Sequence, residues 1–482
     1  MHAFLLLHLL MLLACHRRRL RPPPTPVKKK FQPPVATLQA TMLGSLHHQP
    51  HHSSSSDDTD PNNDAKNGSH STGAGAAFLA ATSPPSARDL VLACADLLQR
   101  GDLPAARRAA GVLLSAASPR ADASDRLAYH FARALALRAD AAAAPPGHLL
   151  VPSSSASAAA RPPPSGAYLA FNQIAPFLRF AHLTANQAIL DAVEGARRIH
   201  ILDLDAAHGV QWPPLLQAIA ERAASPGSGP PPEVRITGAG ADRDTLLRTG
   251  SRLRAFARSI HLPFRFTPLL LSSSASTTTG GSAAAAAAAT ASSAAAATTG
   301  LELHSDETLA VNCVMFLHKL GGQDEVSAFL KWVKAMSPAV VTVAEREPAG
   351  GGGHEYDRTD DDLPRRAAVA MEHYAAVFEA LEATAPPGSR ERMAVEQEVL
   401  GREIEAALAP AGGRWWRGLE RWGAAARAAG FAARPLSAFA VSQARLLLRL
   451  HYPSEGYLVQ EARGACFLGW QTRPLLSVSA WQ

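Results

Sequence analysis

The sequence has few cysteines and almost no long apolar stretches. Its four cysteines, Cys15, Cys94, Cys313 and Cys466, lie far apart and form no CxxC pair. This spacing excludes a zinc finger and a disulfide framework, and it fits a reducing compartment. The one long apolar run, from Ala3 to Ala14, is about a dozen residues and too short to span a bilayer. We therefore expect no membrane partner and no metal site.

Charge of one sign is also scarce over most of the chain. The sequence holds 47 Lys and Arg against 41 Asp and Glu, for a net charge of +6. Seven of these cations lie within residues 1–30, which contain no acidic residue, so the rest of the chain is close to neutral. Near-neutrality argues against the broad basic surface of many nucleic-acid-binding proteins. A local basic groove remains an open alternative, because it is not visible in one dimension.

Residues 1–85 are expected to form a disordered N-terminal tail. Residues 47–85 are rich in His, Ser, Asp, Asn, Gly and Pro, and such a segment does not bury enough apolar surface to offset the entropy of ordering. The first apolar run precedes its basic residues, which reverses the order of a secretory signal, and Met42 is an alternative start. The basic triplets Arg17–Arg19 and Lys28–Lys30 resemble a nuclear import signal, with a solvated basic arm as the alternative.

Three amphipathic helices are predicted in the segment that follows the tail. Ser86 and Asp89 have the spacing of a capping box, which marks the start of the first helix. Leucines then recur at helical spacing, at Leu90, Leu97, Leu98, Leu127 and Leu135. Such a stripe forms either the core of a helical bundle or a surface for a partner helix.

An α/β pattern occupies most of the remaining chain. It follows a Pro/Ala/Ser linker at residues 140–165 and a helix over residues 168–194, broken at Pro176. Strands are predicted at residues 197–204, 234–237, 264–268, 308–316 and 339–344, and helices at residues 215–222, 244–260, 324–336, 363–384, 390–408 and 414–429. This alternation is typical of a mostly parallel sheet with helices on both faces. Residues 272–300 form a low-complexity insertion, and residues 457–481 are expected to form closing strands, in a hairpin at the sheet edge.

The loops after the first two strands lack the glycines that a cofactor site needs. Ligands of such sheets bind at the carboxyl ends of the strands, where a nucleotide-like group requires bare backbone. The first strand ends at Asp203, and its loop contains one glycine, Gly209. After the second strand, Gly238-Ala239-Gly240 begins like GxGxxG but has Arg243 in the third place. We therefore expect no cofactor and interpret the scaffold as a methyltransferase-like fold with a decayed site. A SAM-dependent small-molecule methyltransferase is the alternative.

Other chemistries lack their residues as well, so no catalytic site is predicted. The sequence contains no GxSxG and no HExxH. Glu345 and Glu347 follow the fifth strand, and we expect them to hold an arginine or cap a helix rather than act in catalysis. His200 lies within the first apolar strand and is expected to be a hydrogen-bonded core histidine, with a ligand role as the alternative.

The first strand and its loop resemble the VHIID signature of the plant-specific GRAS family. The residues that carry this resemblance are Ile199, His200, Ile201, Leu202, Asp203, Gly209, Gln211, Trp212 and Pro213. The end of the chain is similar to the SAW region of the same family, through Trp422, Gly423, Trp470, Ser479, Ala480 and Trp481. Residues 166–173, GAYLAFNQ, are similar to the Lateral suppressor/Monoculm subgroup.

The other family regions are similar in the same order, so the resemblance covers residues 86–482. The expected regions are leucine-rich region I at 86–148, the VHIID region at 167–235 with its motif at 199–203, leucine-rich region II at 244–270, the PFYRE region at 308–408 and the SAW region at 411–482. The insertion at 272–300 and the apolar N-terminus depart from the usual family pattern.

The resemblance implies both a fold and a function. It implies a methyltransferase-like (Rossmann-type) α/β core with an α-helical cap. It implies a non-enzymatic transcriptional regulator in the nucleus that acts through other transcription factors, including GRAS proteins, as a homo- or heterodimer, with double-stranded DNA as a further candidate ligand. The subgroup implies promotion of axillary meristem and shoot branch (tiller) formation. A pure scaffold that never contacts DNA is a further alternative.

Overall fold

The structure, a computed structural model, describes most of the chain from Ser86 onward. The described ranges are 86–143, 165–206, 208–225, 229–271, 301–320, 323–348, 362–409 and 418–482. The predicted disordered tail at 1–85, most of the predicted linker at 140–165 and the predicted insertion at 272–300 lie outside these residues.

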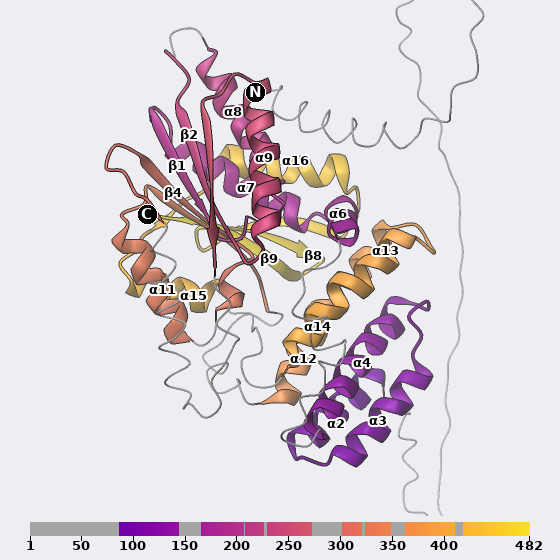
Figure 1. Cartoon of the computed structure of the whole chain (residues 1–482). Coiled ribbons are helices and arrows are strands. Elements are labelled where there is room, and N and C mark those ends of the chain that lie inside the picture. Colours follow the sequence, from indigo (N-terminus) through magenta and orange to yellow (C-terminus); the bar gives the residue numbers. More distant parts are fainter. Residues whose placement is uncertain are drawn as a thin grey trace, which may run out of the picture. The chain divides into compact units, whose positions relative to one another are not determined.

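Nine strands of the described residues form one mixed sheet (Figure 1). They are β1 Arg198–Asp203, β2 Glu233–Gly240, β3 Phe264–Leu270, β4 Thr308–Val314, β5 Val340–Arg346, β6 Ala433–Arg434, β7 Tyr457–Ala462, β8 Ala465–Trp470 and β9 Arg473–Trp481. The order is β3-β2-β1-β4-β5-β9-β8-β7, with β6 paired to β9. The first five strands are parallel, and their order places a switch point between β1 and β4, as in Rossmann-type folds. The predicted mostly parallel core is confirmed.

The inner strands are apolar on both faces, because helices cover both. Ile199 and Ile201 point into one core cluster, and Leu202 and Val311 point into the other, as the alternation of strand side chains requires. The helices of the first face are α7 Phe177–Ala192, α8 Trp212–Ala223 and α9 Arg243–Ser259, with α16 Ala438–His451 packed against α7. The helices of the second face are α11 Gln323–Ala335 and α15 Leu419–Ala428 (Figure 1).

An α-helical cap adjoins the sheet core. Its helices are α2 Ala87–Gln99, α3 Leu103–Ala116, α4 Ala123–Ala143, α6 Ser165–Ile174, α12 Leu363–Thr384, α13 Arg390–Val395 and α14 Gly401–Ala407. In Figure 1 the indigo helices α2, α3 and α4 lie beside α12 and α14. The predicted capping box is confirmed: the Asp89 amide donates to Ser86 Oγ at 3.2 Å, and the Ser86 amide donates to Asp89 Oδ2 at 3.0 Å.

Side-chain burial in the cap distinguishes the two roles predicted for the leucine stripe. Leu127 and Leu135 are 5% and 0% exposed and belong to the cap core. The prediction that they offer a surface to a partner helix is therefore wrong, because the chain's own helices α2, α3 and α12 bury α4. Leu90, Leu97 and Leu98 are half-buried and pack on the edge of the same core, so a contact with a partner stays a prediction for these three.

Several predicted elements differ from the structure. Helix α16 was not predicted. The predicted helix at 390–408 contains a π-helical turn, Glu396–Leu400, and the one at 414–429 is helical from Leu419 onward in the described residues. The closing strands are three, not a hairpin, and β9 lies inside the sheet between β5 and β8 rather than at its edge.

Candidate functional site

The strand register brings polar side chains together at the switch point. Asp203, the last residue of β1, pairs with Asn312 of β4, and Asn312 pairs with Thr342 of β5. All three lie on the face of the sheet that α7 and α8 cover, because they share the strand alternation of Ile201, Ala310 and Val340. In a doubly wound sheet this crevice is the place where a ligand binds.

A buried hydrogen-bond network fills this crevice. Its members, here called the crevice network, are Asn186, Asp203, Gln211, Trp212, Asn312 and Thr342, each at most 5% exposed. Asp203 accepts from Trp212 Nε1 at 2.9 Å and from Asn312 Nδ2 at 3.1 Å. Asn312 Oδ1 accepts from Gln211 Nε2 at 3.0 Å and from Thr342 Oγ1 at 3.0 Å. Gln211 Nε2 also donates to Asn186 Oδ1 of α7 at 3.1 Å.

The Asp203 carboxylate binds other members of the crevice network. Burial raises the pKa of Asp203 to about 6, and the hydrogen bonds from Asn312 and Trp212 oppose that rise. Buried polar groups of this kind stabilise a fold only when all of their partners are present. The network therefore joins β1, β4 and β5 to the helices that cover them, and it engages both carboxylate oxygens of the buried Asp203.

The glycines near the crevice serve packing. Gly209 has a φ of +64°, and a Cβ there would lie 2.6 Å from the Thr249 side chain. Gly238 and Gly240 lie within β2, which is longer than predicted, so the partial GxGxxG match is not a loop. A Cβ on Gly238 would lie 2.6 Å from the Phe266 ring. At these glycines, the chain's own side chains pack directly against the backbone. The residues present therefore do not fit a nucleotide-like cofactor.

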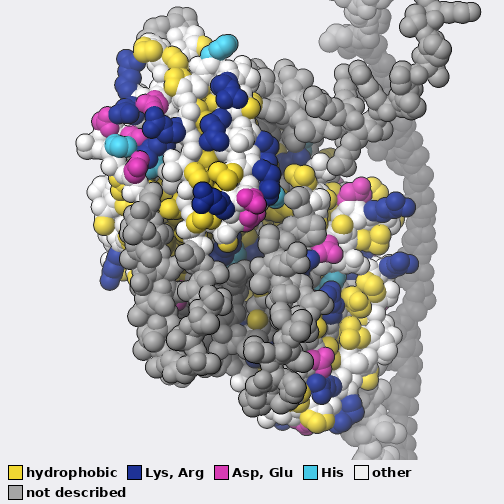
Figure 2. All heavy atoms as spheres, viewed as in Figure 1, with side chains coloured by type: hydrophobic (Ala, Val, Ile, Leu, Met, Phe, Trp, Pro, Cys, Tyr) yellow, Lys and Arg dark blue, Asp and Glu magenta, His cyan; other side chains and the backbone are white. Residues whose placement is uncertain are grey.

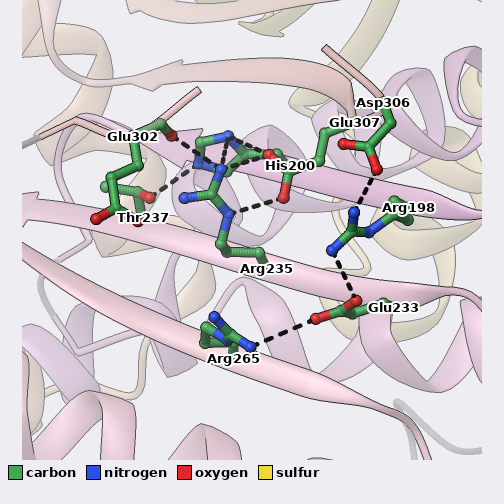
Figure 3. A network of polar contacts seen from close by, with 9 residues as sticks. All are labelled: Arg198, His200, Glu233, Arg235, Thr237, Arg265, Glu302, Asp306 and Glu307. Carbon is green, nitrogen blue, oxygen red and sulfur yellow. Dashed lines mark hydrogen bonds and ion pairs between the residues drawn. The ribbon is translucent and has the colours of Figure 1, made fainter. Parts of the chain in front are cut away.

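The motif histidine belongs to a second buried network near the amino ends of the strands (Figure 3). His200 Nε2 contacts Thr237 Oγ1 at 2.8 Å, and Arg235 Nη2 contacts His200 Nδ1 at 3.1 Å. A guanidinium can only donate, so Nδ1 accepts and Nε2 carries the proton. Burial, with Arg235 beside the ring, lowers the pKa of His200 to about 4. The ring is neutral near pH 7, and its 3.4 Å approach to Glu307 is not an ion pair.

Arg235 ties this network to the segment before β4. It donates to Glu307 Oε1 at 2.9 Å and to the Glu302 carbonyl at 2.8 Å. Figure 3 also shows a more exposed chain in which Arg198 bridges Asp306 and Glu233. The prediction of a hydrogen-bonded core histidine at His200 is confirmed.

Glu345 and Glu347 each cap a helix, which is one of the two roles predicted for them. Glu345 Oε1 accepts from the Leu317 amide at 2.6 Å, at the start of a 3₁₀ turn. Glu347 Oε1 accepts from the Leu419 amide at 3.0 Å, at the first residue of α15, and from Ser477 Oγ at 2.6 Å. Burial raises the pKa of Glu347 to about 7.

The SAW-like residues build the C-terminal core. Trp481 on β9 is 2% exposed and meets Trp422 of α15 edge to face, with ring centroids 5.4 Å apart. Gly423 lies beside the Trp481 ring. Trp470 packs on Tyr457 at 4.9 Å, while Ser479 and Ala480 are buried on β9. Pro213 lies in the first turn of α8, where its missing N–H costs nothing.

Sequence reasoning missed three members of the crevice network, Asn186, Asn312 and Thr342. Asn312 and Thr342 are each a polar residue inside an otherwise apolar strand, in Leu309–Val314 and Val340–Ala344. A polar side chain in a strand buried on both faces needs a partner inside the protein. That signal pointed to a network at the switch point, although it did not identify the partners.

The fold and this site define a Rossmann-type α/β protein whose switch-point crevice is filled by its own side chains. The family model for the GRAS domain family matches residues 87–482. The chain is 78% identical to Protein MONOCULM 1 of Oryza sativa subsp. japonica over 399 residues, which cover 83% of this chain and 88% of that protein. The chain therefore belongs to the GRAS domain family, in the subgroup that contains Protein MONOCULM 1.

Two further comparisons agree. Scarecrow-like protein 18 of Arabidopsis thaliana is 45% identical over 324 residues, which cover 65% of this chain and 67% of that protein. The crystal structure of SCL7 in Oryza sativa matches with a TM-score of 0.61 and 31% identity, covering 83% of this chain and 100% of that chain. The Rossmann-type core with a helical cap is thus a fold that this family shares.

Two kinds of feature are absent from the described residues. No helix there combines the length and the apolarity needed to cross a bilayer. No group of three His, Cys, Asp or Glu side chains there is arranged to hold a metal ion.

Proposed function

We propose that the chain is a nuclear transcriptional regulator that acts through protein partners and promotes axillary meristem and shoot branch formation. The observation that carries this proposal is the 78% identity to Protein MONOCULM 1 over most of both chains. The filled crevice supports a role as a platform for macromolecules rather than as an enzyme, because its polar groups bind one another. Partner transcription factors, including other GRAS proteins in homo- or heterodimers, are the expected ligands.

The plant itself tests the developmental role. Loss of the gene is expected to reduce the number of axillary shoots, and the wild-type chain under its own promoter is expected to restore it. A chain fused to a nuclear export signal serves as the matched control and is expected to fail. Normal branching in the loss-of-function line, or full rescue by the exported chain, would contradict the proposal.

Titration with SAM separates the platform from the methyltransferase alternative. Calorimetry on the purified full chain is expected to show no heat of binding at micromolar concentrations. Micromolar binding together with methyl transfer to a small molecule would favour the enzyme. A gel-shift series with duplex DNA at increasing salt tests the DNA contact, since several phosphate contacts give a steep loss of affinity with salt.

A further inference from the structure

Helix α9 concentrates positive charge on the surface of an otherwise near-neutral domain. Its 17 residues, about 25 Å of helix, contain five arginines, at Arg243, Arg248, Arg252, Arg254 and Arg258. The single acidic residue in the helix is Asp244. Figure 2 shows Lys and Arg side chains gathered on the face of the molecule where α9 lies toward the viewer in Figure 1.

The arginines flank a strip of small and apolar side chains. Leu247, Ser251 and Ala255 recur every fourth residue and are exposed, Leu247 by 42%. With 3.6 residues per turn, Arg248 and Arg252 lie on one side of this strip and Arg254 and Arg258 lie on the other, while Arg243 precedes Leu247 at the start of the same row. We call this surface the arginine face of α9. Its opposite side, through Leu246, Leu253 and Ala257, is buried against the domain.

Little of this charge is neutralised within the described residues. Arg252 donates to two neutral oxygens, the His208 carbonyl at 3.0 Å and Thr249 Oγ1 at 2.9 Å. Arg248 lies 3.8 Å from Asp242, with both side chains more than half exposed, and such a surface pair contributes little. Arg243 and Arg258 are exposed and have no ion pair among the described residues. Neighbouring arginines repel one another, so the face favours an anionic partner.

We propose that the arginine face of α9 binds an acidic amphipathic helix of a partner protein. The inference rests on the proposed function as a regulator that acts through protein partners. The apolar strip distinguishes a helix from a phosphate backbone: the exposed Leu247, next to Arg243 and Arg248, matches an apolar stripe flanked by carboxylates, whereas a phosphate backbone gains nothing from it. The small side chains of Ser251 and Ala255 let a second helix approach closely, and guanidinium groups bind carboxylates in a two-pronged geometry.

Fluorescence anisotropy with the purified full chain tests the proposal. The probe is a synthetic peptide of about 18 residues, roughly the length of α9, with a leucine stripe flanked by glutamates. Two further probes are a scrambled peptide of the same composition and a DNA duplex. The variants are Arg248→Glu with Arg252→Glu on one side of the strip, and Arg243→Glu with Arg258→Glu, at the start of the strip and on its other side. The matched control is Arg108→Glu with Arg120→Glu, two exposed arginines of the cap, and circular dichroism melting checks that each variant is folded.

The amphipathic peptide is expected to bind at least tenfold more weakly to each α9 variant, and within about twofold of the wild type to the control. A peptide with lysine in place of glutamate is expected to bind the Arg248→Glu, Arg252→Glu variant better than the wild type. Equal binding of the scrambled peptide, loss of DNA binding alone in the α9 variants, or no binding of the amphipathic peptide each overturns the proposal. Binding of the purified chain needs neither nuclear import nor transcription. If the chain restores branching but does not bind the peptide, only this inference is refuted. If the chain binds the peptide but does not restore branching, only the proposed function is refuted.

Discussion

At the scale of single residues, the family motif is a set of buried polar contacts rather than a set of reactive groups. Asp203 and His200 lie on opposite faces of the same strand and join two different networks. Each network links β1 to neighbouring elements, and each side chain in it is costly to leave without a partner. The motif therefore specifies how the central strands and their helices fit together.

Replacing Asn312 tests the crevice network. Asn312→Ala removes the partner of Asp203, Gln211 and Thr342 at once, and it should lower the free energy of unfolding by about 2–4 kcal/mol, because buried polar groups lose their hydrogen bonds. Thr342→Val is the matched variant; it removes one hydrogen bond and should cost about 1 kcal/mol. Urea unfolding followed by circular dichroism measures both. Equal small losses in the two variants would show that the network carries little stability.

Glu347 makes stability depend on pH in a defined direction. Burial raises its pKa from 4.5 to about 7, so the folded state holds a proton that the unfolded chain has released. The resulting stability is complete below pH 4.5 and is lost as the pH rises toward 7. In Glu347→Gln this dependence disappears, so the variant should gain about 2–3 kcal/mol relative to the wild type between pH 5 and pH 8. Urea unfolding at both pH values measures the gain. The exposed Glu455→Gln should show no such gain, and a Glu347→Gln curve parallel to that of the wild type would refute the argument.

At the scale of elements, two glycines show how strand and helix packing differ. Gly238→Ala places a Cβ 2.6 Å from the Phe266 ring and 2.9 Å from Ala206 Cβ, so it should destabilise the protein by about 1–3 kcal/mol. Gly423→Ala in α15 meets Trp481 at an ordinary 3.5 Å. Because alanine favours a helix by up to about 1 kcal/mol over glycine, that change should be neutral or stabilising. Thermal melting compares the pair, and a reversed order would contradict the packing described here.

A buried ion pair joins α4 to the π-helical turn. Arg126 Nε donates to Glu396 at 3.0 Å, and the two side chains are 0% and 1% exposed. Arg126→Met should cost about 3–5 kcal/mol, because it leaves the buried Glu396 carboxylate with only its longer contact, 3.7 Å, to Arg392. The double variant Arg126→Met, Glu396→Leu should recover part of that loss, since the buried Arg392 then loses its carboxylate partner. A double-mutant cycle by urea unfolding measures the coupling, and a sum of independent effects would show that the pair does not act as a unit.

The sequence predicted elements well where local signals decide and poorly where distant contacts decide. The capping box at Ser86 and the break at Pro176 are local, and both elements were found. The π-helical turn begins at Glu396, whose buried carboxylate binds Arg126, some 270 residues away in the chain. Asn312 and Thr342 likewise owe their roles to strand register. Helix α16 has a local N-cap, Ser437, and was nevertheless missed.

At the scale of the whole domain, β9 joins the parallel strands of the sheet to its antiparallel strands. β9 pairs with β5, β6 and β8. Trp481→Ala should cost about 3–5 kcal/mol, because it opens a cavity beside Trp422. The half-buried Trp332→Ala is the matched variant and should cost less. Urea unfolding measures the free energy of unfolding of both variants. A smaller loss for Trp481→Ala than for Trp332→Ala would show that Trp481 is not a main source of the domain's stability.

The central position of β9 also bears on how the protein is made. During translation β5 emerges at residue 346, while its antiparallel neighbour begins only at residue 473. In that interval the nascent chain carries an open backbone edge on its most apolar strands, which is a template for wrong pairing. Ribosome-bound chains of this protein should therefore engage chaperones while the residues between β5 and β9 are being synthesised.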